Sequence, residues 1–164
     1  MKTFPQEEEH PLALRESLLE VLKGSIGSSM FRKLYRLRGN VMIEDVINDG
    51  DLACAFFVST ILSMFGLISG GVHTTVRVTL EDMKESGWRQ AKTAHALAVV
   101  VWGEKQGDDG SPHLHIGICI NEHSAIEHSA KTKSPRMIGI TDLTMPDGSP
   151  RPILAYFVHP KLVL

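Results

Sequence analysis

The spacing of apolar residues changes once along this chain, and that change fixes the class of fold. Before about residue 88, apolar residues recur at helical spacing, as at Leu14, Leu18 and Leu22. After about residue 98, runs of β-forming residues alternate with turn residues, beginning with Ala98 to Trp102. Helices followed by an antiparallel sheet make an α+β fold. We therefore predict N-terminal helices and a cysteine-bearing helix packed on a small antiparallel β-sheet.

Four helices are predicted in the first half of the chain, each bounded by residues that start or stop a helix. They cover residues 11–24, residues 28–38, the stretch from Asp51 to about Phe65, and a short stretch through Leu80, Met83 and Trp88. Turn-forming residues are dense from Asn48 to Asp51. This density places Cys54 in the first turn of the third helix.

Strands are predicted in the second half. Residues 98–102 and 113–120 form a hairpin around a loop rich in Gly and Asp. Further strands are expected at 137–140 and 153–158, with a turn at Pro146 to Gly148 between them.

Length and composition indicate one globular domain. The chain has 164 residues, of which 43% are hydrophobic and 22% charged. We expect a loose acidic leader at 1–10, a helical N-terminal part at 11–47 and the core at 48–164. The formal net charge of −2 argues against a nucleic-acid partner. The oligomeric state stays open.

Two segments bear on where the protein acts. Glu7 to Glu9 lie where a secretory signal needs basic and then apolar residues, so we expect a cytoplasmic protein. Release by lysis or by a dedicated secretion route is the alternative. The apolar run Leu52 to Ser69 contains Ser59 and Thr60, which favours a buried helix over a membrane span.

Cys54 is the candidate nucleophile. Only the thiolate of cysteine attacks efficiently, and the positive end of a helix together with a nearby imidazole favours that form. The backbone N–H of Cys54, unpaired in a first helical turn, is a candidate donor to the oxyanion. Cys119 lies between Ile118 and Ile120 without a helix start nearby, so we interpret it as structural.

Histidines on the predicted strand supply the candidate base. His113 and His115 are two residues apart and therefore share one face, so either can meet Cys54. His128 follows a turn and can return alongside that strand to orient the imidazole.

Three segments together carry a resemblance to a known family: Asp51 to Val58 (DLACAFFV), Ala98 to Gly103 (AVVVWG) and His115 to Ile118 (HIGI). They resemble the NlpC/P60 (papain-like) cysteine peptidase and amidase superfamily, of which the chain looks like a divergent member. The resemblance covers about residues 48 to 130, in the order of the family. It implies a papain-like core at 48–164.

The resemblance also implies roles and a reaction. Cys54 corresponds to the nucleophile and His115, directly before Ile-Gly, to the base. The family places a polar His, Asn or Gln about a dozen positions after the base, a role that we assign to His128. Members cleave amide bonds in peptidoglycan stem peptides through a thioester, without a cofactor. The implied partner is a peptide or a peptidoglycan fragment of the cell wall.

Two other interpretations remain open. His113 and His115 form an His-x-His pair, and His73, His123 or His128 can complete the ligand set of a metal-dependent hydrolase. Alternatively, Cys54 is an inert buried residue of a non-enzymatic interaction protein.

Overall fold

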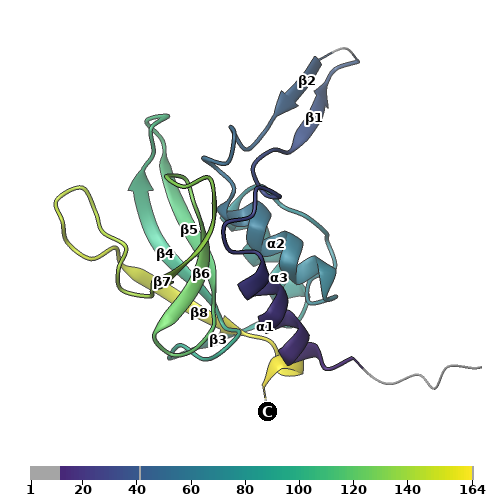
Figure 1. The fold of residues 1–164 in the computed structure, drawn as a ribbon, viewed down its shortest axis with the longest axis vertical. Helices are drawn as coiled ribbons and strands as arrows, with labels where there is room; N and C mark the ends of the chain where they lie inside the picture. The colour runs from purple at the N-terminus through teal and green to yellow at the C-terminus, as the bar shows by residue number, and fades with distance from the viewer. Residues whose placement is uncertain (1–11, 41, 164) are drawn as a thin grey trace, which may run out of the picture.

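The computed structural model describes residues 12–40 and 42–163 and shows an α+β fold of three helices, a six-stranded antiparallel sheet and a two-stranded sheet (Figure 1). The helices are α1 (Leu14–Gly24), α2 (Cys54–Met64) and α3 (Val76–Glu85), and a short 3-10 helix covers Pro160–Leu162. The strands are β1 (Tyr35–Arg38), β2 (Met42–Asp45), β3 (Arg89–Ala91), β4 (Val99–Gln106), β5 (Pro112–Cys119), β6 (Ser124–Ser129), β7 (Ser134–Gly139) and β8 (Ile153–Val158). The large sheet has the order β3-β8-β4-β5-β6-β7. The predicted leader at 1–10 lies outside the described residues.

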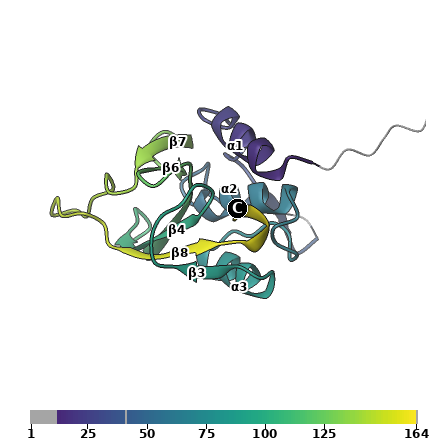
Figure 2. The same cartoon turned by 90° about the horizontal axis from the view of Figure 1, so that it is seen from below.

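The three helices lie on one side of the large sheet (Figures 1 and 2). Helix α2 packs on β5 and β6 and contacts both other helices. It is apolar almost all round, as expected of a helix enclosed by neighbours. The core between helices and sheet includes Phe57, Ile61, Val101 and Ile116, all buried. Burial of such side chains stabilises the fold by roughly 1.5–3 kcal/mol each.

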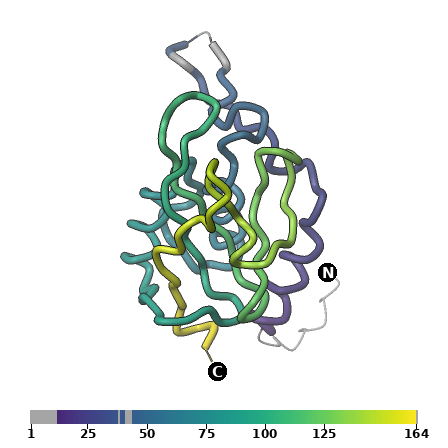
Figure 3. The backbone as a smooth tube through the Cα atoms, turned by 90° about the vertical axis from the view of Figure 1, so that its left-hand side faces the viewer, coloured from purple at the N-terminus to yellow at the C-terminus, as the bar shows by residue number. Residues whose placement is uncertain are grey.

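The opposite face of the sheet has a second, smaller core around Trp102. The indole is fully buried, and its Nε1 donates to the carbonyl oxygen of Ile140 at 3.0 Å. A Cβ on Gly117 would lie 3.2 Å from the Trp102 ring and 2.9 Å from the carbonyl oxygen of Ile126, so glycine is needed there. The connection from β7 to β8 crosses in front of this face (Figure 3).

Most predicted elements are present. The helix that ends at Gly24 and the hairpin of β4 and β5 are confirmed. The helix predicted through Leu80, Met83 and Trp88 is present as α3, but it ends at Glu85, before Trp88. Helix α2 begins at Cys54 and not at Asp51, because Ile47 to Asp51 form turns in which Asn48 and Asp49 have positive φ. Strands β3 and β6 had not been assigned from the sequence.

The predicted helix at 28–38 is wrong, and so is the description of 11–47 as helical throughout. Residues 35–38 pair with β2 in a hairpin that projects from the rest of the molecule (Figure 1). The base of the hairpin is held by the Asp45 carboxylate, which accepts from the backbone N–H groups of Leu34, Ile47 and Asp49. The pairing of β1 with β2 and the bond from Leu34 to Asp45 outweigh the helical spacing of the apolar residues.

Within residues 12–40 and 42–163, none of the helices has the length and apolar character needed to cross a bilayer.

Candidate active site

Cys54 is the first residue of α2. The N-cap residue Ala53 provides no side-chain cap, and its carbonyl accepts from the N–H of Phe57 at 2.8 Å. The N–H groups of the first turn, starting with Cys54 itself, therefore have no partner within the helix. The partly buried thiol lies at the positive end of α2, where a negative charge is favoured.

His115 lies on β5, and its imidazole is fixed from two sides. Its Nε2 lies 2.8 Å from Oε2 of Glu127, and its ring centroid lies 5.4 Å from that of Trp102. Because a carboxylate only accepts, Nε2 is the protonated nitrogen that donates. Nδ1 is then the nitrogen available for the Cys54 thiol. The imidazole is 14% exposed, so it is largely shielded from solvent.

Glu127 on β6 is the residue that orients His115. Its side chain is 1% exposed, and its second oxygen, Oε1, accepts from Nε of Arg136 at 2.5 Å. Burial alone would raise the pKa of Glu127, but the hydrogen bonds and positive charges of His115 and Arg136 outweigh it and hold the pKa below its usual value. The carboxylate is therefore ionised at neutral pH.

The same contacts decide the charge of His115. Burial lowers the pKa of the imidazole, but hydrogen bonding to Cys54 and Glu127 and the negative charges of both groups outweigh that effect and raise it to about 9. His115 is thus an imidazolium at neutral pH. A cation in that position stabilises a thiolate on Cys54.

The strand register brings the three residues together. The ladder between β5 and β6 ends at Gly117 opposite Glu127, so His115 lies just beyond its last pair. Glu127 reaches diagonally along the strand to meet the imidazole. The loop that leads into α2 is tied to the turn after β6 by an ion pair between Asp51 and Lys133. These contacts hold the start of α2 beside the two strands.

The assignment of the orienting role to His128 requires correction. Neighbouring residues of a strand point to opposite faces, so His128 points away from the Glu127 side. Its side chain is 1% exposed and lies against the ring of Phe31, and both ring nitrogens lack a hydrogen-bond partner among the described residues. Glu127, the preceding residue, contacts the His115 imidazole instead.

The remaining candidates lie apart from this triad. His113 Nε2 bonds the carboxylate of Asp109 at 2.9 Å in the exposed end of the hairpin, and His73 bonds Asp82 at 2.7 Å. No group of three potential metal ligands occurs in the part of the chain that the structure describes. Among residues 12–40 and 42–163, the His-x-His pair therefore has no third ligand.

Cys119 has the surroundings of a structural residue. Both cysteines are free, but Cys119 is fully buried in the core around Trp102. Burial raises the pKa of its thiol to about 12. The structure therefore separates the two cysteines by environment.

Two arginines near these residues were not identified from the sequence. Arg136 binds the Glu127 carboxylate, and Arg151 binds backbone carbonyls of the neighbouring strands. Arg151 precedes β8 and donates through Nε to the carbonyl oxygen of Gly103 at 2.7 Å. One of its terminal nitrogens, Nη2, donates to the carbonyl oxygen of His113 at 2.6 Å. No motif marks either arginine, since both reach the site through the pairing of distant strands.

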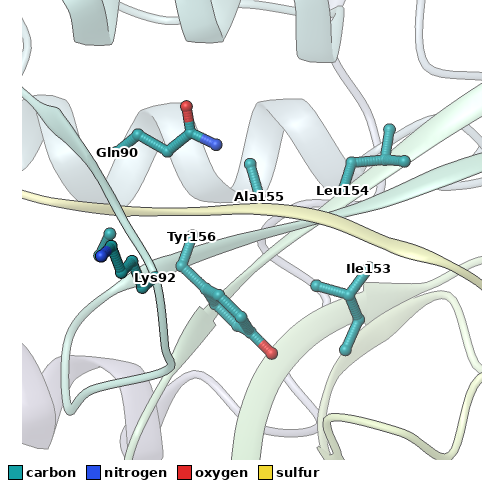
Figure 4. A pocket seen from close by; sticks show the side chains of 7 residues that line it. Gln90, Lys92, Ile153, Leu154, Ala155 and Tyr156 are labelled. Carbon is teal, nitrogen blue, oxygen red and sulfur yellow. The ribbon is translucent and has the colours of Figure 1, made fainter.

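A shallow hollow elsewhere on the surface lies between β3 and β8 (Figure 4). Gln90 and Lys92 line one side, and Ile153 to Tyr156 line the other. None of Cys54, His115 and Glu127 borders it. It is therefore separate from the candidate active site.

In comparisons with protein-family models and with curated proteins, the sequence matches none.

Proposed function

We propose that this protein is a cysteine hydrolase that cleaves amide bonds, with peptidoglycan stem peptides as its substrate. The observation that carries the proposal is the hydrogen bond from Nε2 of His115 to the buried Glu127 carboxylate, which leaves Nδ1 for a thiol at a helix start. In this proposal Cys54 is the nucleophile, His115 is the base and Glu127 orients the base, as acyl transfer requires.

The reaction follows from these positions. The Cys54 thiolate attacks the amide carbon, a C–S bond forms, and the carbonyl oxygen takes the negative charge. The N–H groups of the first turn of α2 are available to stabilise this oxyanion. The His115 imidazolium gives its proton to the nitrogen, the C–N bond breaks and the amine leaves.

Hydrolysis of the thioester completes the cycle. His115, now neutral, takes a proton from water, and the resulting hydroxide equivalent attacks the thioester carbon. The C–S bond breaks, the acid is released, and the thiolate and imidazolium are restored. The cycle consumes one water and uses no cofactor.

Alkylation by iodoacetamide between pH 5 and pH 9 tests the proposal. We expect rapid labelling of Cys54 below pH 7, detected by mass spectrometry of the peptides, while Cys119 in the same molecule stays unlabelled. The rapid phase disappears in His115→Ala. Slow labelling of Cys54 with the profile of a free thiol, near pH 8.5, would contradict an activated nucleophile.

A further inference from the structure

Arg136 is a cation that faces Glu127 from the edge strand of the large sheet. The two residues lie directly opposite each other in the ladder between β6 and β7, so their side chains share one face. Nε of Arg136 donates to Oε1 of Glu127 at 2.5 Å. The Arg136 side chain is 39% exposed, whereas that of Glu127 is 1% exposed. Arg136 therefore joins a buried carboxylate to the solvent-facing edge of the sheet.

The two oxygens of Glu127 are divided between two donors. Oε1 accepts from Arg136, and Oε2 lies 2.8 Å from Nε2 of His115. Each contact restrains one oxygen, so together they fix the plane of the carboxylate. That plane sets the direction in which His115 donates, and hence the direction in which its Nδ1 points. Without Arg136, Oε1 would lose its side-chain partner in a buried position, which is unfavourable.

Burial makes the charge of Glu127 dependent on Arg136. A carboxylate that has lost its hydration keeps its charge only if donors and positive groups replace the water. His115 and Arg136 both bond Glu127, and both lower its pKa. The charge of Arg151 also interacts with Glu127, but the Arg151 guanidinium donates to backbone carbonyls. Loss of Arg136 therefore leaves His115 as the bonded cation.

The other titratable groups near this pair are bonded elsewhere or point away. His128 follows Glu127 on β6 and points to the opposite face of the sheet. Lys133, in the turn before β7, forms an ion pair with Asp51. Cys54 bonds the His115 imidazole. None of these groups takes the place of Arg136 at Oε1 within the part of the chain that the structure describes.

We propose that Arg136 is a positioning residue of the proposed reaction, which keeps Glu127 ionised and turned toward His115 so that the imidazole faces Cys54. This role rests on the proposed function, because it adds a fourth residue to the same site. Arg136 acts through Glu127 and does not touch the reacting atoms. Its removal should therefore matter at low pH, where Glu127 takes up a proton, and have little effect at high pH.

The pH profile of iodoacetamide labelling at Cys54 tests this role in the wild type, Arg136→Gln and Glu127→Gln. Loss of Arg136 raises the pKa of Glu127, so the carboxylate is protonated at a higher pH. The acid limb of the profile should move upward by about one pH unit, the lower end of the effect of a neighbouring opposite charge. At pH 5 the rate of Arg136→Gln should approach that of Glu127→Gln. At pH 8 it should stay within about twofold of the wild type.

Lys131→Gln and Arg136→Lys are the controls. Lys131 is an exposed cation in the turn between β6 and β7, and its loss should leave the profile unchanged. Arg136→Lys keeps a positive charge opposite Glu127 and should restore most of the acid limb. An Arg136→Gln profile equal to that of the wild type, or a rate that falls by the same factor at every pH, would overturn the assignment.

Arg136→Gln combined with Glu127→Gln shows whether Arg136 acts through Glu127. The profile of the double variant should match that of Glu127→Gln alone, because the effects of residues in one hydrogen-bonded chain are not additive. A further slowing in the double variant would mean that Arg136 acts on the thiol by another route, and would also overturn the assignment.

NMR titration of the wild type covers the case in which Arg136→Gln does not fold. The Nε–H signal of Arg136 should shift with the same midpoint as the carboxyl carbon of Glu127. Different midpoints would overturn the assignment. Slow iodoacetamide labelling of wild-type Cys54 at neutral pH would instead count against the proposed function, so the two failures are distinguishable.

Discussion

The Oε2 atom of Glu127 lies 2.8 Å from Nε2 of His115, and the carboxylate that makes this contact is almost fully buried. A neutral polar group in this position would orient the imidazole without adding charge. The Glu127 carboxylate orients the imidazole, because it fixes which ring nitrogen faces the thiol. Its negative charge also stabilises the imidazolium. The charge state of the site therefore depends on one residue of β6.

Glu127→Gln should lower the pKa of His115, because the negative charge that raises it is removed while a hydrogen-bonding side chain of the same shape stays. A carboxylate neighbour accounts for roughly one to three pH units. Titration of the His115 ring by NMR checks the pKa, and iodoacetamide labelling of Cys54 at pH 6 should become slower. Glu104→Gln, on the exposed side of β4, is the control. An unchanged titration curve in Glu127→Gln would show that the contact is only structural.

The two cysteines should respond differently to substitution. Cys54→Ala is expected to abolish hydrolysis while the thermal unfolding temperature stays close to that of the wild type. Cys119→Ala should keep nearly all activity but unfold at lower temperature, because it leaves a small cavity beside Trp102. Activity assays and thermal unfolding of both variants decide the matter. Activity retained in Cys54→Ala would rule out the thiol mechanism.

His115→Ala and His113→Ala separate the thiol mechanism from a metal site. Loss of His115 removes the base and should reduce kcat by at least about a hundredfold. His113 bonds Asp109 near the exposed end of the hairpin. Because a substitution at an exposed position has small effects, His113→Ala should leave kcat within about threefold of the wild type. Metal analysis of the purified protein accompanies the assay. Equal losses in both variants, together with bound zinc, would favour the metal interpretation.

His128 should make the protein sensitive to acid. Burial lowers the pKa of this imidazole to about 4, with smaller effects from the charges of Glu127, His115 and Lys133. The unfolded histidine titrates near 6.5, so between these values the unfolded state binds more protons. The neutral histidine thus gives full stability above pH 6.5. That stability is lost as the pH falls toward 4, by roughly 1.4 kcal/mol per pH unit.

Urea unfolding at several pH values checks this dependence. His128→Leu should lose less stability between pH 6.5 and pH 4 than the wild type does. His123→Gln, which changes an exposed histidine, should follow the wild type. A slope in His128→Leu equal to that of the wild type would mean that other groups cause the acid sensitivity.

Much of the fold was predictable because local signals agreed with the final packing. The run of β-formers from Ala98, the polar loop and the strand with His115 gave a hairpin that is present as β4 and β5. The prediction was wrong at 28–38, where Phe31, Leu34 and Tyr35 have helical spacing. Tyr35 and Leu37 are instead exposed on a strand. The partner strand β2 and the anchor Asp45 decide that structure, and neither is visible from local spacing.

The candidate site was predictable in part. Cys54 lies at the start of a helix and His115 lies on a strand, and both elements were predicted from the sequence. The third residue was misassigned by one position, because the side to which a β6 residue points depends on its register with β5. A spacing of about a dozen residues after His115 fits Glu127 and His128 alike, so the spacing could not choose between them. The two arginines follow only from three-dimensional strand pairing.

The alternation of Glu127 and His128 on β6 also links the candidate site to the pairing of the sheet. If β6 were displaced by one residue, the Glu127 carboxylate would enter the apolar core against α2, and Ile126 or His128 would take its position beside His115. Such a chain would lack the carboxylate contact of His115 and would also be strongly destabilised. Molecules with this pairing error would therefore not accumulate as stable, native-like copies.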